Sequence, residues 1–278
     1  MAATTSDAVK TYRYVRLSMI TLVLGLAAAV AVERLEVAAG CFQHSISAYY
    51  YTPVRGMFVG GLLGIGVCLV ALRGNNDAED ALLNLAGMLA PVVAFVPTPS
   101  QGTCSSSPGS GGDRDADVYN NMSALFVIGV LGLAVTAWLL WKDQHRLRSS
   151  VVGFALGVAL LVAAVLVFAL ARGFFVRNAH YAAAVTMFAA ILGVVVLNAL
   201  GFHRKQVAQG REPTRPYTNR YAVIAGAMIA GAGGIGVWDV AVGWDHAVLW
   251  IEGVLITLFG VFWAMQTEEL WEGGVRAE

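Results

Sequence analysis

The chain has 278 residues, of which 58% are hydrophobic and only 13% charged, and its mean hydropathy is +0.66. A water-soluble domain of this size does not carry so much apolar surface, so the composition excludes that class and indicates a protein embedded in a lipid bilayer. Lys plus Arg and Asp plus Glu both number 18, and because this balance gives no general attraction to polyanions, we expect no nucleic-acid partner.

Eight apolar runs along the chain predict an all-α fold, a polytopic transmembrane helix bundle of about eight helices. Each run approaches the roughly 20 residues that a helix needs to cross the hydrocarbon of a bilayer. The runs are 17–38, 55–72, 81–98, 121–141, 151–171, 179–200, 220–240 and 247–266. We therefore expect a single transmembrane domain over 17–266, with tails at 1–16 and 267–278.

The positions of the basic residues predict the orientation of the bundle. Most of the 18 Lys and Arg residues fall in segments on the same side as the N-terminus. The positive-inside rule then places the N-terminus in the cytoplasm, and an even number of helices brings the C-terminus back to that side. The expected location is the cell membrane, crossed several times, which in a bacterium is the inner membrane.

The first apolar run has a competing interpretation as a cleaved signal peptide. Lys10, Arg13 and Arg16 precede it, and it ends in Ala-Val-Ala at 29–31, which is a cleavage pattern of such peptides. Cleavage would leave seven helices and would not change the orientation of those that follow.

Two connecting segments differ from the rest in composition. Residues 99–120 are rich in Ser, Gly and Pro, which predicts a flexible extracytoplasmic loop. Residues 203–219 form a basic cytoplasmic loop, typical of a topology determinant that contacts anionic headgroups. Cys41 and Cys104 both fall outside the membrane in this topology, where an oxidising compartment would allow a disulfide between them.

Glycines recur in three runs at intervals that suit close helix packing. They are Gly56, Gly60 and Gly64, then Gly153 and Gly157, and then Gly226, Gly231, Gly233, Gly234 and Gly236. Small residues at this spacing let two helices approach backbone to backbone, within one chain or across the interface of a homo-oligomer. Alternatively, the glycine-rich run at 220–240 bends or unwinds beside a ligand.

Ionisable residues are costly inside a membrane, and here nearly all of those near the apolar runs lie at the predicted outer ends. We expect these residues to surround one extracytoplasmic mouth. The candidate ligand-binding residues are Tyr49, Tyr50, Arg55, His180, Asp239 and Glu252. Glu252 lies six positions beyond His246, about 9 Å into the last helix, so we predict that it faces the bundle and either pairs with a cation such as Arg55 or binds protons.

Metal chemistry has weaker support in the sequence. His44, His180 and His246, with Asp239 or Glu252, have the chemistry of a zinc site with an open position for water. However, no His-x-x-x-His pair places two ligands on one helical face, and no Cys-x-x-Cys pair occurs. We therefore predict no cofactor. The acidic segment at 113–117 imitates an EF-hand loop, but Val118 replaces the required glycine, so we expect no calcium site.

Several motifs resemble a family of uncharacterised bacterial polytopic membrane proteins. They are Ser-Ile-Ser-Ala-Tyr-Tyr-Tyr-Thr at 45–52, Asn-Leu-Ala-Gly at 84–87, the segment that begins at His180, Asn-Arg-Tyr at 219–221, and Glu252 followed by Phe259, Gly260 and Trp263. Family members often have an acidic residue where this chain has Gly56, and a lysine where it has residues 264–266. The resemblance implies a multi-pass helical fold and supports these positions, but it implies no activity.

Three functions follow as hypotheses from this pattern. The first is an integral membrane protein that binds or passes a small or lipid-like ligand through a polar cavity on the extracytoplasmic side. The second is an intramembrane metal-dependent hydrolase resembling alkaline ceramidases, which the missing paired-histidine motif disfavours. The third is a structural or assembly role, in which the ionisable residues tie helices together.

Overall fold

A computed structural model of the chain describes residues 7–37, 42–99, 114–142, 148–208 and 219–273, and over these residues it is helical with no β-strand. The all-α prediction is confirmed for this part of the chain. The long helices are α1 (Asp7–Val32), α2 (Arg55–Ala71), α3 (Asp77–Phe95), α4 (Arg114–Lys142), α5 (Arg148–Leu170), α6 (Arg172–Ala208), α7 (Arg220–Val242) and α8 (Ala247–Glu269). A π-helical turn, η1 (Glu33–Val37), extends α1, and a short 3-10 helix, η2 (Ser47–Tyr51), precedes α2.

Seven of these helices are long and apolar enough to cross a membrane, and α2, with 17 residues, is the shorter exception. Several helices extend beyond the apolar runs that predicted them. Residues 114–120, expected in a loop, form the start of α4, and residues 203–208 belong to α6, which has 37 residues. Likewise, α1 begins within the predicted N-terminal tail and α8 ends within the C-terminal one. Hydropathy locates only the part of a helix that suits hydrocarbon, and a helix continues into water wherever its polar residues permit.

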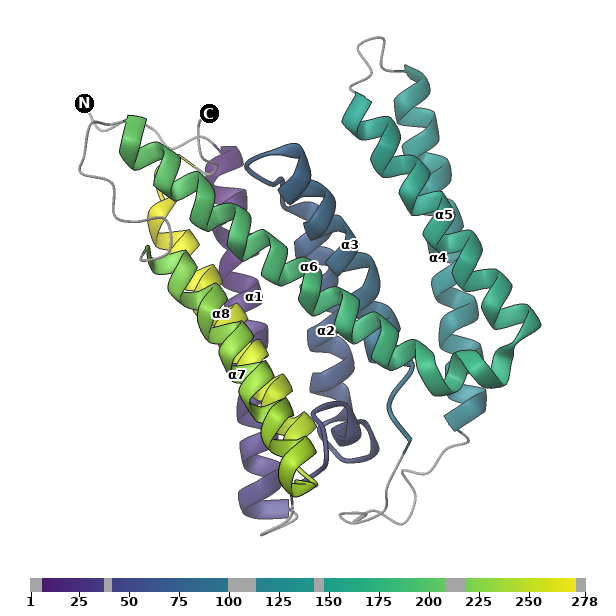
Figure 1. Cartoon of the computed structure of the whole chain (residues 1–278). Helices are drawn as coiled ribbons and strands as arrows, with labels where there is room; N and C mark the ends of the chain where they lie inside the picture. The colour runs from purple at the N-terminus through teal and green to yellow at the C-terminus, as the bar shows by residue number, and fades with distance from the viewer. Residues whose placement is uncertain (1–6, 38–41, 100–113, 143–147, 209–218, 274–278) are drawn as a thin grey trace.

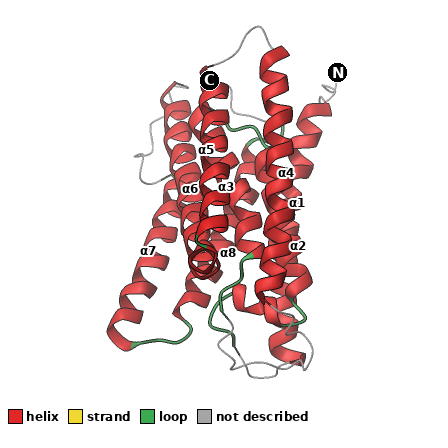
Figure 2. Cartoon of the chain, turned by 90° about the vertical axis from the view of Figure 1, so that its right-hand side faces the viewer, coloured by secondary structure: helices red, strands yellow, loops and turns green. Residues whose placement is uncertain are grey.

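The helices run roughly side by side along one axis and alternate in direction (Figures 1 and 2). The start of α1 and the end of α8 lie at the same end of the bundle, together with the turn between α2 and α3 (Figure 1). We call this the terminal end. Residues 42–54 and 243–246 lie at the opposite end, which we call the distal end. An even number of passes accounts for this arrangement.

Asparagine and glycine residues set several helix boundaries. The Asn76 side chain accepts a hydrogen bond from the Glu79 backbone N–H at the start of α3, and Asn219 accepts from the N–H groups of Tyr221 and Ala222 at the start of α7. Both satisfy amides that have no partner within the helix. At the end of α7, Gly243 adopts a φ of 67°, a left-handed conformation that favours glycine.

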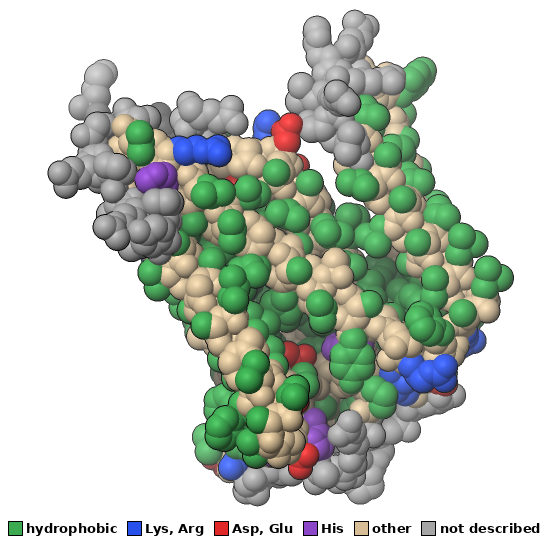
Figure 3. Space-filling model, viewed as in Figure 1, with side chains coloured by type: hydrophobic (Ala, Val, Ile, Leu, Met, Phe, Trp, Pro, Cys, Tyr) green, Lys and Arg blue, Asp and Glu red, His purple; other side chains and the backbone are tan. Residues whose placement is uncertain are grey.

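Six helices share the main hydrophobic core, whereas α4 and α5 form a hairpin beside it (Figure 1). A smaller cluster of buried residues joins this hairpin to the end of α3 and the start of α6. Its members are Val96, Val118, Met122, Phe168, Phe175 and Val176. Figure 3 shows that the surface between the two ends of the molecule is largely hydrophobic, while most of the visible charged side chains lie toward the ends. Such a surface suits a bilayer better than water.

The glycines play two different structural roles. A Cβ atom on Gly66 of α2 would lie 2.8 Å from the carbonyl oxygen of Gly87 on α3, so these helices approach backbone to backbone there. Gly64 also packs closely, against Leu22 of α1. In contrast, a Cβ on Gly56 or Gly60 would meet no atom within 4 Å, so these two glycines leave space instead of closing it.

The glycine-rich α7 is a continuous α-helix, so it does not unwind in this structure, and the alternative that it bends beside a ligand stays a prediction. Gly231 packs against Val254 of α8, with 2.8 Å between an ideal Cβ and Cγ1. Gly226, Gly233, Gly234 and Gly236 face open space. A role for these four in a homo-oligomer interface stays a prediction.

Candidate functional site

Arg55 and Asp117 form an ion pair at the distal end, with 2.8 Å between Nη2 and Oδ2. The same nitrogen donates to the hydroxyl of Tyr50 at 2.5 Å, and the guanidinium lies 4.1 Å from the centre of the Tyr50 ring. Burial raises the pKa of the Tyr50 hydroxyl, so this group stays protonated and donates to Asp117. Of the two alternatives predicted for Glu252, pairing with Arg55 is not observed, because Asp117 from the first turn of α4 pairs with Arg55; proton binding by Glu252 stays a prediction.

A pocket of about 370 Å³ opens beside this ion pair, between α2, the end of α3 and α4. We call it the α2–α4 pocket. Tyr50, Arg55 and Asn121 provide its polar groups. The rest of its lining is Gly56, Val59, Gly60 and Phe95. Asn121 lies one turn after Asp117 on the same face of α4. The space exists because Gly56 and Gly60 carry no side chains.

Hydrogen bonds hold the 3-10 helix η2 and the residues before it in place. The Tyr51 hydroxyl donates to the Thr98 carbonyl at 2.9 Å, and the hydroxyls of Ser47 and Thr98 lie 2.8 Å apart. Tyr49 is 1% exposed and packs in the main core, so it is a structural residue rather than one open to a ligand. Of the three tyrosines, Tyr50 alone lines the α2–α4 pocket.

Glu252 connects α8 to the segment that precedes η2. Its Oε2 accepts a hydrogen bond from the backbone N–H of Ile46 at 2.6 Å, and Ser47 provides a second backbone donor. The carboxylate thus satisfies amides that the irregular segment leaves without partners. Glu252 does face the protein, as predicted, but it accepts hydrogen bonds from backbone amides and forms no ion pair with a cation among the described residues.

The three histidines do not form a metal site. The rings of His44 and His246 stack with 5.8 Å between their centres, and each Nδ1 lies within hydrogen-bonding distance of a backbone carbonyl oxygen. His180 is buried, with its Nδ1 2.8 Å from the carbonyl oxygen of Val96. Over the part of the chain that the structure describes, no group of three or more His, Cys, Asp or Glu side chains is placed to hold a metal ion.

Asp239 has a structural position at the end of α7. Its Oδ1 accepts from the backbone N–H of Trp244 at 2.9 Å, and its carbonyl accepts from the N–H of Gly243. These contacts close the turn between α7 and α8.

The predicted single mouth is therefore two separate arrangements at the distal end: the α2–α4 pocket with Tyr50 and Arg55, and the junction of residues 42–47 with α8. The proposed disulfide between Cys41 and Cys104 lies outside the described residues.

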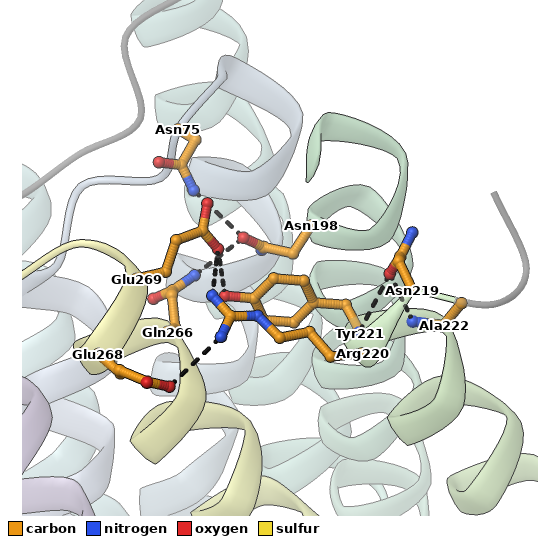
Figure 4. A network of polar contacts seen from close by, with 9 residues as sticks. All are labelled: Asn75, Asn198, Asn219, Arg220, Tyr221, Ala222, Gln266, Glu268 and Glu269. Carbon is orange, nitrogen blue, oxygen red and sulfur yellow. Dashed lines mark hydrogen bonds and ion pairs between the residues drawn. The ribbon is translucent and has the colours of Figure 1, made fainter. Parts of the chain in front are cut away.

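A buried polar network, which was not predicted from the sequence, lies at the terminal end. Glu79 of α3 is 2% exposed and accepts hydrogen bonds from the side chains of Asn75 and Asn198. Gln266 of α8 donates to the Asn198 side-chain oxygen at 3.0 Å (Figure 4). Arg16 of α1, also buried, interacts electrostatically with Glu79. The detectable signal was a set of amide side chains, Asn198 and Gln266, inside otherwise apolar runs.

A second part of this network connects α7 to α8. The hydroxyl of Tyr221 donates a hydrogen bond to the carboxylate of Glu269 (Figure 4). Arg220 forms ion pairs with Glu268 and Glu269, each with 3.3 Å between a guanidinium nitrogen and a carboxylate oxygen. Asn219 both caps α7 and donates to the Ala199 carbonyl of α6. These contacts tie α6, α7 and α8 together at this end.

The fold and these sites define an all-helical bundle with membrane-type apolar helices. No protein-family model matches the chain, and no curated protein or solved structure matches it.

Proposed function

We propose that the chain is a multi-pass membrane protein that binds a small or lipid-like ligand in the α2–α4 pocket. The observation that carries this proposal is the composition of the pocket wall. Arg55, Tyr50 and Asn121 present polar groups, while Gly56, Val59, Gly60 and Phe95 leave an apolar hollow of about 370 Å³. A volume of this size lies in the range of small-ligand pockets, which combine an apolar lining with a few polar groups.

The chemistry of the polar groups indicates what the ligand presents there. Both contacts of Arg55, to Tyr50 and Asp117, use Nη2. A guanidinium has further N–H donors on its other nitrogens, and these suit hydrogen-bond acceptors of a ligand. Because Asp117 already balances the charge of Arg55, the ligand is best described as carrying a polar, hydrogen-bond-accepting head and an apolar body.

The proposal includes a location and an orientation. The seven long apolar helices support a protein of the cell membrane, the inner membrane if the source is bacterial, as the resemblance to a bacterial family implies. The excess of Lys and Arg on the side of the N-terminus supports a cytoplasmic terminal end, which puts the α2–α4 pocket on the extracytoplasmic side.

Filling the pocket tests this function. In Gly60→Leu, the new side chain fills part of the pocket, and its Cβ has room because an ideal Cβ at this position meets no atom within 4 Å. Gly233→Leu on α7 is the matched control, since Gly233 is also exposed and open but does not line the pocket. Small molecules and lipids that remain with the detergent-purified protein are extracted and identified by mass spectrometry.

We expect a compound that is retained by the wild type and Gly233→Leu and lost from Gly60→Leu. Arg55→Gln should weaken its retention while leaving the pocket open. Identical extracts from all four proteins, with unchanged unfolding temperatures, would contradict a binding role for the pocket.

A further inference from the structure

A second hollow lies on the other side of the bundle, between α1 and α8. It has a volume of about 410 Å³, and we call it the α1–α8 groove. Its wall is mostly apolar and is widened by small residues, namely Ala27 and Ala31 of α1 and Gly253 of α8. An ideal Cβ on Gly253 would meet no atom within 4 Å, so this glycine leaves part of the groove open. Thr257 donates its hydroxyl to the Gly253 carbonyl, so that polar group is satisfied within α8.

The dimensions of the α1–α8 groove match one leaflet of a bilayer. It extends from Val23 to Arg34 along α1 and η1, which corresponds to about 16 Å at the rise of an α-helix. Half of a typical hydrocarbon core is about 15 Å thick. The groove therefore has the length of an acyl chain of one leaflet, and it runs along α1 toward the distal end.

Arg34 closes the distal end of this groove. Its guanidinium lies 4.5 Å from the centre of the Phe42 ring, and both residues line the groove. Glu33 and Glu36 neighbour Arg34 in sequence, yet among the described residues no carboxylate lies within 4.0 Å of it. The Nε atom is buried and has no hydrogen-bond partner in that same part of the chain. This differs from Arg55, whose charge is balanced by Asp117.

We propose that the α1–α8 groove is a binding site for an anionic phospholipid, separate from the α2–α4 pocket. One acyl chain lies in the apolar groove, and the phosphate accepts hydrogen bonds from Arg34 at the membrane surface. Arginine suits this role because its planar guanidinium binds phosphate oxygens in pairs. A zwitterionic lipid carries a compensating cation and gains less from Arg34, so the site discriminates by headgroup charge as well as by the chain.

The test titrates detergent-purified, delipidated protein with phosphatidylglycerol, phosphatidylcholine or inorganic phosphate and follows bound species by native mass spectrometry. We expect the wild type to bind phosphatidylglycerol more tightly than phosphatidylcholine and to bind phosphate alone negligibly. Arg34→Gln should weaken phosphatidylglycerol about tenfold, the loss expected for one charge-assisted contact, and abolish the preference. Arg34→Lys should retain part of it.

A second variant tests the groove without touching the charge. Gly253→Leu should weaken both lipids, whereas Gly233→Leu, at an open position on α7 outside both hollows, should bind both as the wild type does. Equal affinity for the two lipids in the wild type, or unchanged binding in both Arg34→Gln and Gly253→Leu, would overturn the proposal. Because Arg34 and Gly253 line a different hollow, failure of the α2–α4 pocket as a ligand site leaves this test intact.

Discussion

The side-chain amide of Asn198 on α6 donates a hydrogen bond of 2.8 Å to the carboxylate of Glu79 on α3, and both residues are at most 2% exposed. Gln266 of α8 in turn donates to Asn198, so one amide joins three helices. Where the surface of a bundle is largely apolar between its two ends, hydrophobic burial does not choose between helix partners, and such polar contacts specify which faces meet.

Replacing Asn198 tests this role. Asn198→Leu removes a donor from the buried Glu79 carboxylate and the acceptor of Gln266, and an unsatisfied buried group costs roughly 1–3 kcal/mol. We expect a lower unfolding temperature in detergent, measured by differential scanning fluorimetry. Asn178→Leu is the control, because Asn178 is exposed and its amide donates only to Phe174 in its own helix. Equal unfolding temperatures of the two variants would show that the network does not contribute measurably to stability.

The close approach of α2 and α3 leads to a second prediction. Gly87→Ala places a Cβ 2.7 Å from the Gly66 carbonyl oxygen, which forces the helices apart and should cost about 1–3 kcal/mol of unfolding free energy. Gly226→Ala, at an exposed position with open space, should be neutral or slightly stabilising, since alanine favours the helix. The unfolding temperatures of the two variants are compared in the same detergent, and we expect only Gly87→Ala to be lower than the wild type. A tolerated Gly87→Ala would show that the contact is not tight.

The contact between Glu252 and Ile46 predicts a change in local motion. Glu252→Ala removes the acceptor of the Ile46 N–H, so we expect faster hydrogen–deuterium exchange in peptides that cover residues 42–51. Glu252→Gln keeps a carbonyl oxygen and should have a smaller effect. Glu268→Ala, at a side chain 77% exposed, is the control for loss of a glutamate on the same helix. Unchanged exchange at Ile46 in Glu252→Ala would show that other contacts hold this segment.

The proposed topology is testable by accessibility labelling. Asp245 lies at the distal end and Glu272 lies just beyond α8 at the terminal end, and both are exposed. In a background with the native cysteines replaced, a membrane-impermeant maleimide should label Asp245→Cys in intact cells and Glu272→Cys only after permeabilisation. The reverse pattern would place the terminal end outside the cell, and labelling of both from one side would exclude the bundle described above.

The sequence by itself determined the fold class and the positions of the helices. Each helix depends on local properties, since the apolar residues of a run add up along the chain whatever the run packs against. The predicted runs lie within or very near helices of the structure, and their ends differ because polar residues such as those at 114–120 continue a helix beyond hydrocarbon. The common end of Arg55, Glu252 and His246 also followed from counting helices, because alternating passes fix which loops share a side.

Only the tertiary structure decided which polar groups meet. Arg55 pairs with Asp117 on α4 and not with Glu252, and Glu252 binds the backbone of Ile46, 206 residues away in sequence. These pairings depend on the rotation of each helix about its axis and on which helices are neighbours. Hydropathy determines neither, because any apolar helix face can contact lipid. The network around Glu79 and Asn198 could not be predicted for the same reason. Helix rotation and neighbours also determine whether a glycine allows a close contact, as at Gly66, or leaves a pocket open, as at Gly60.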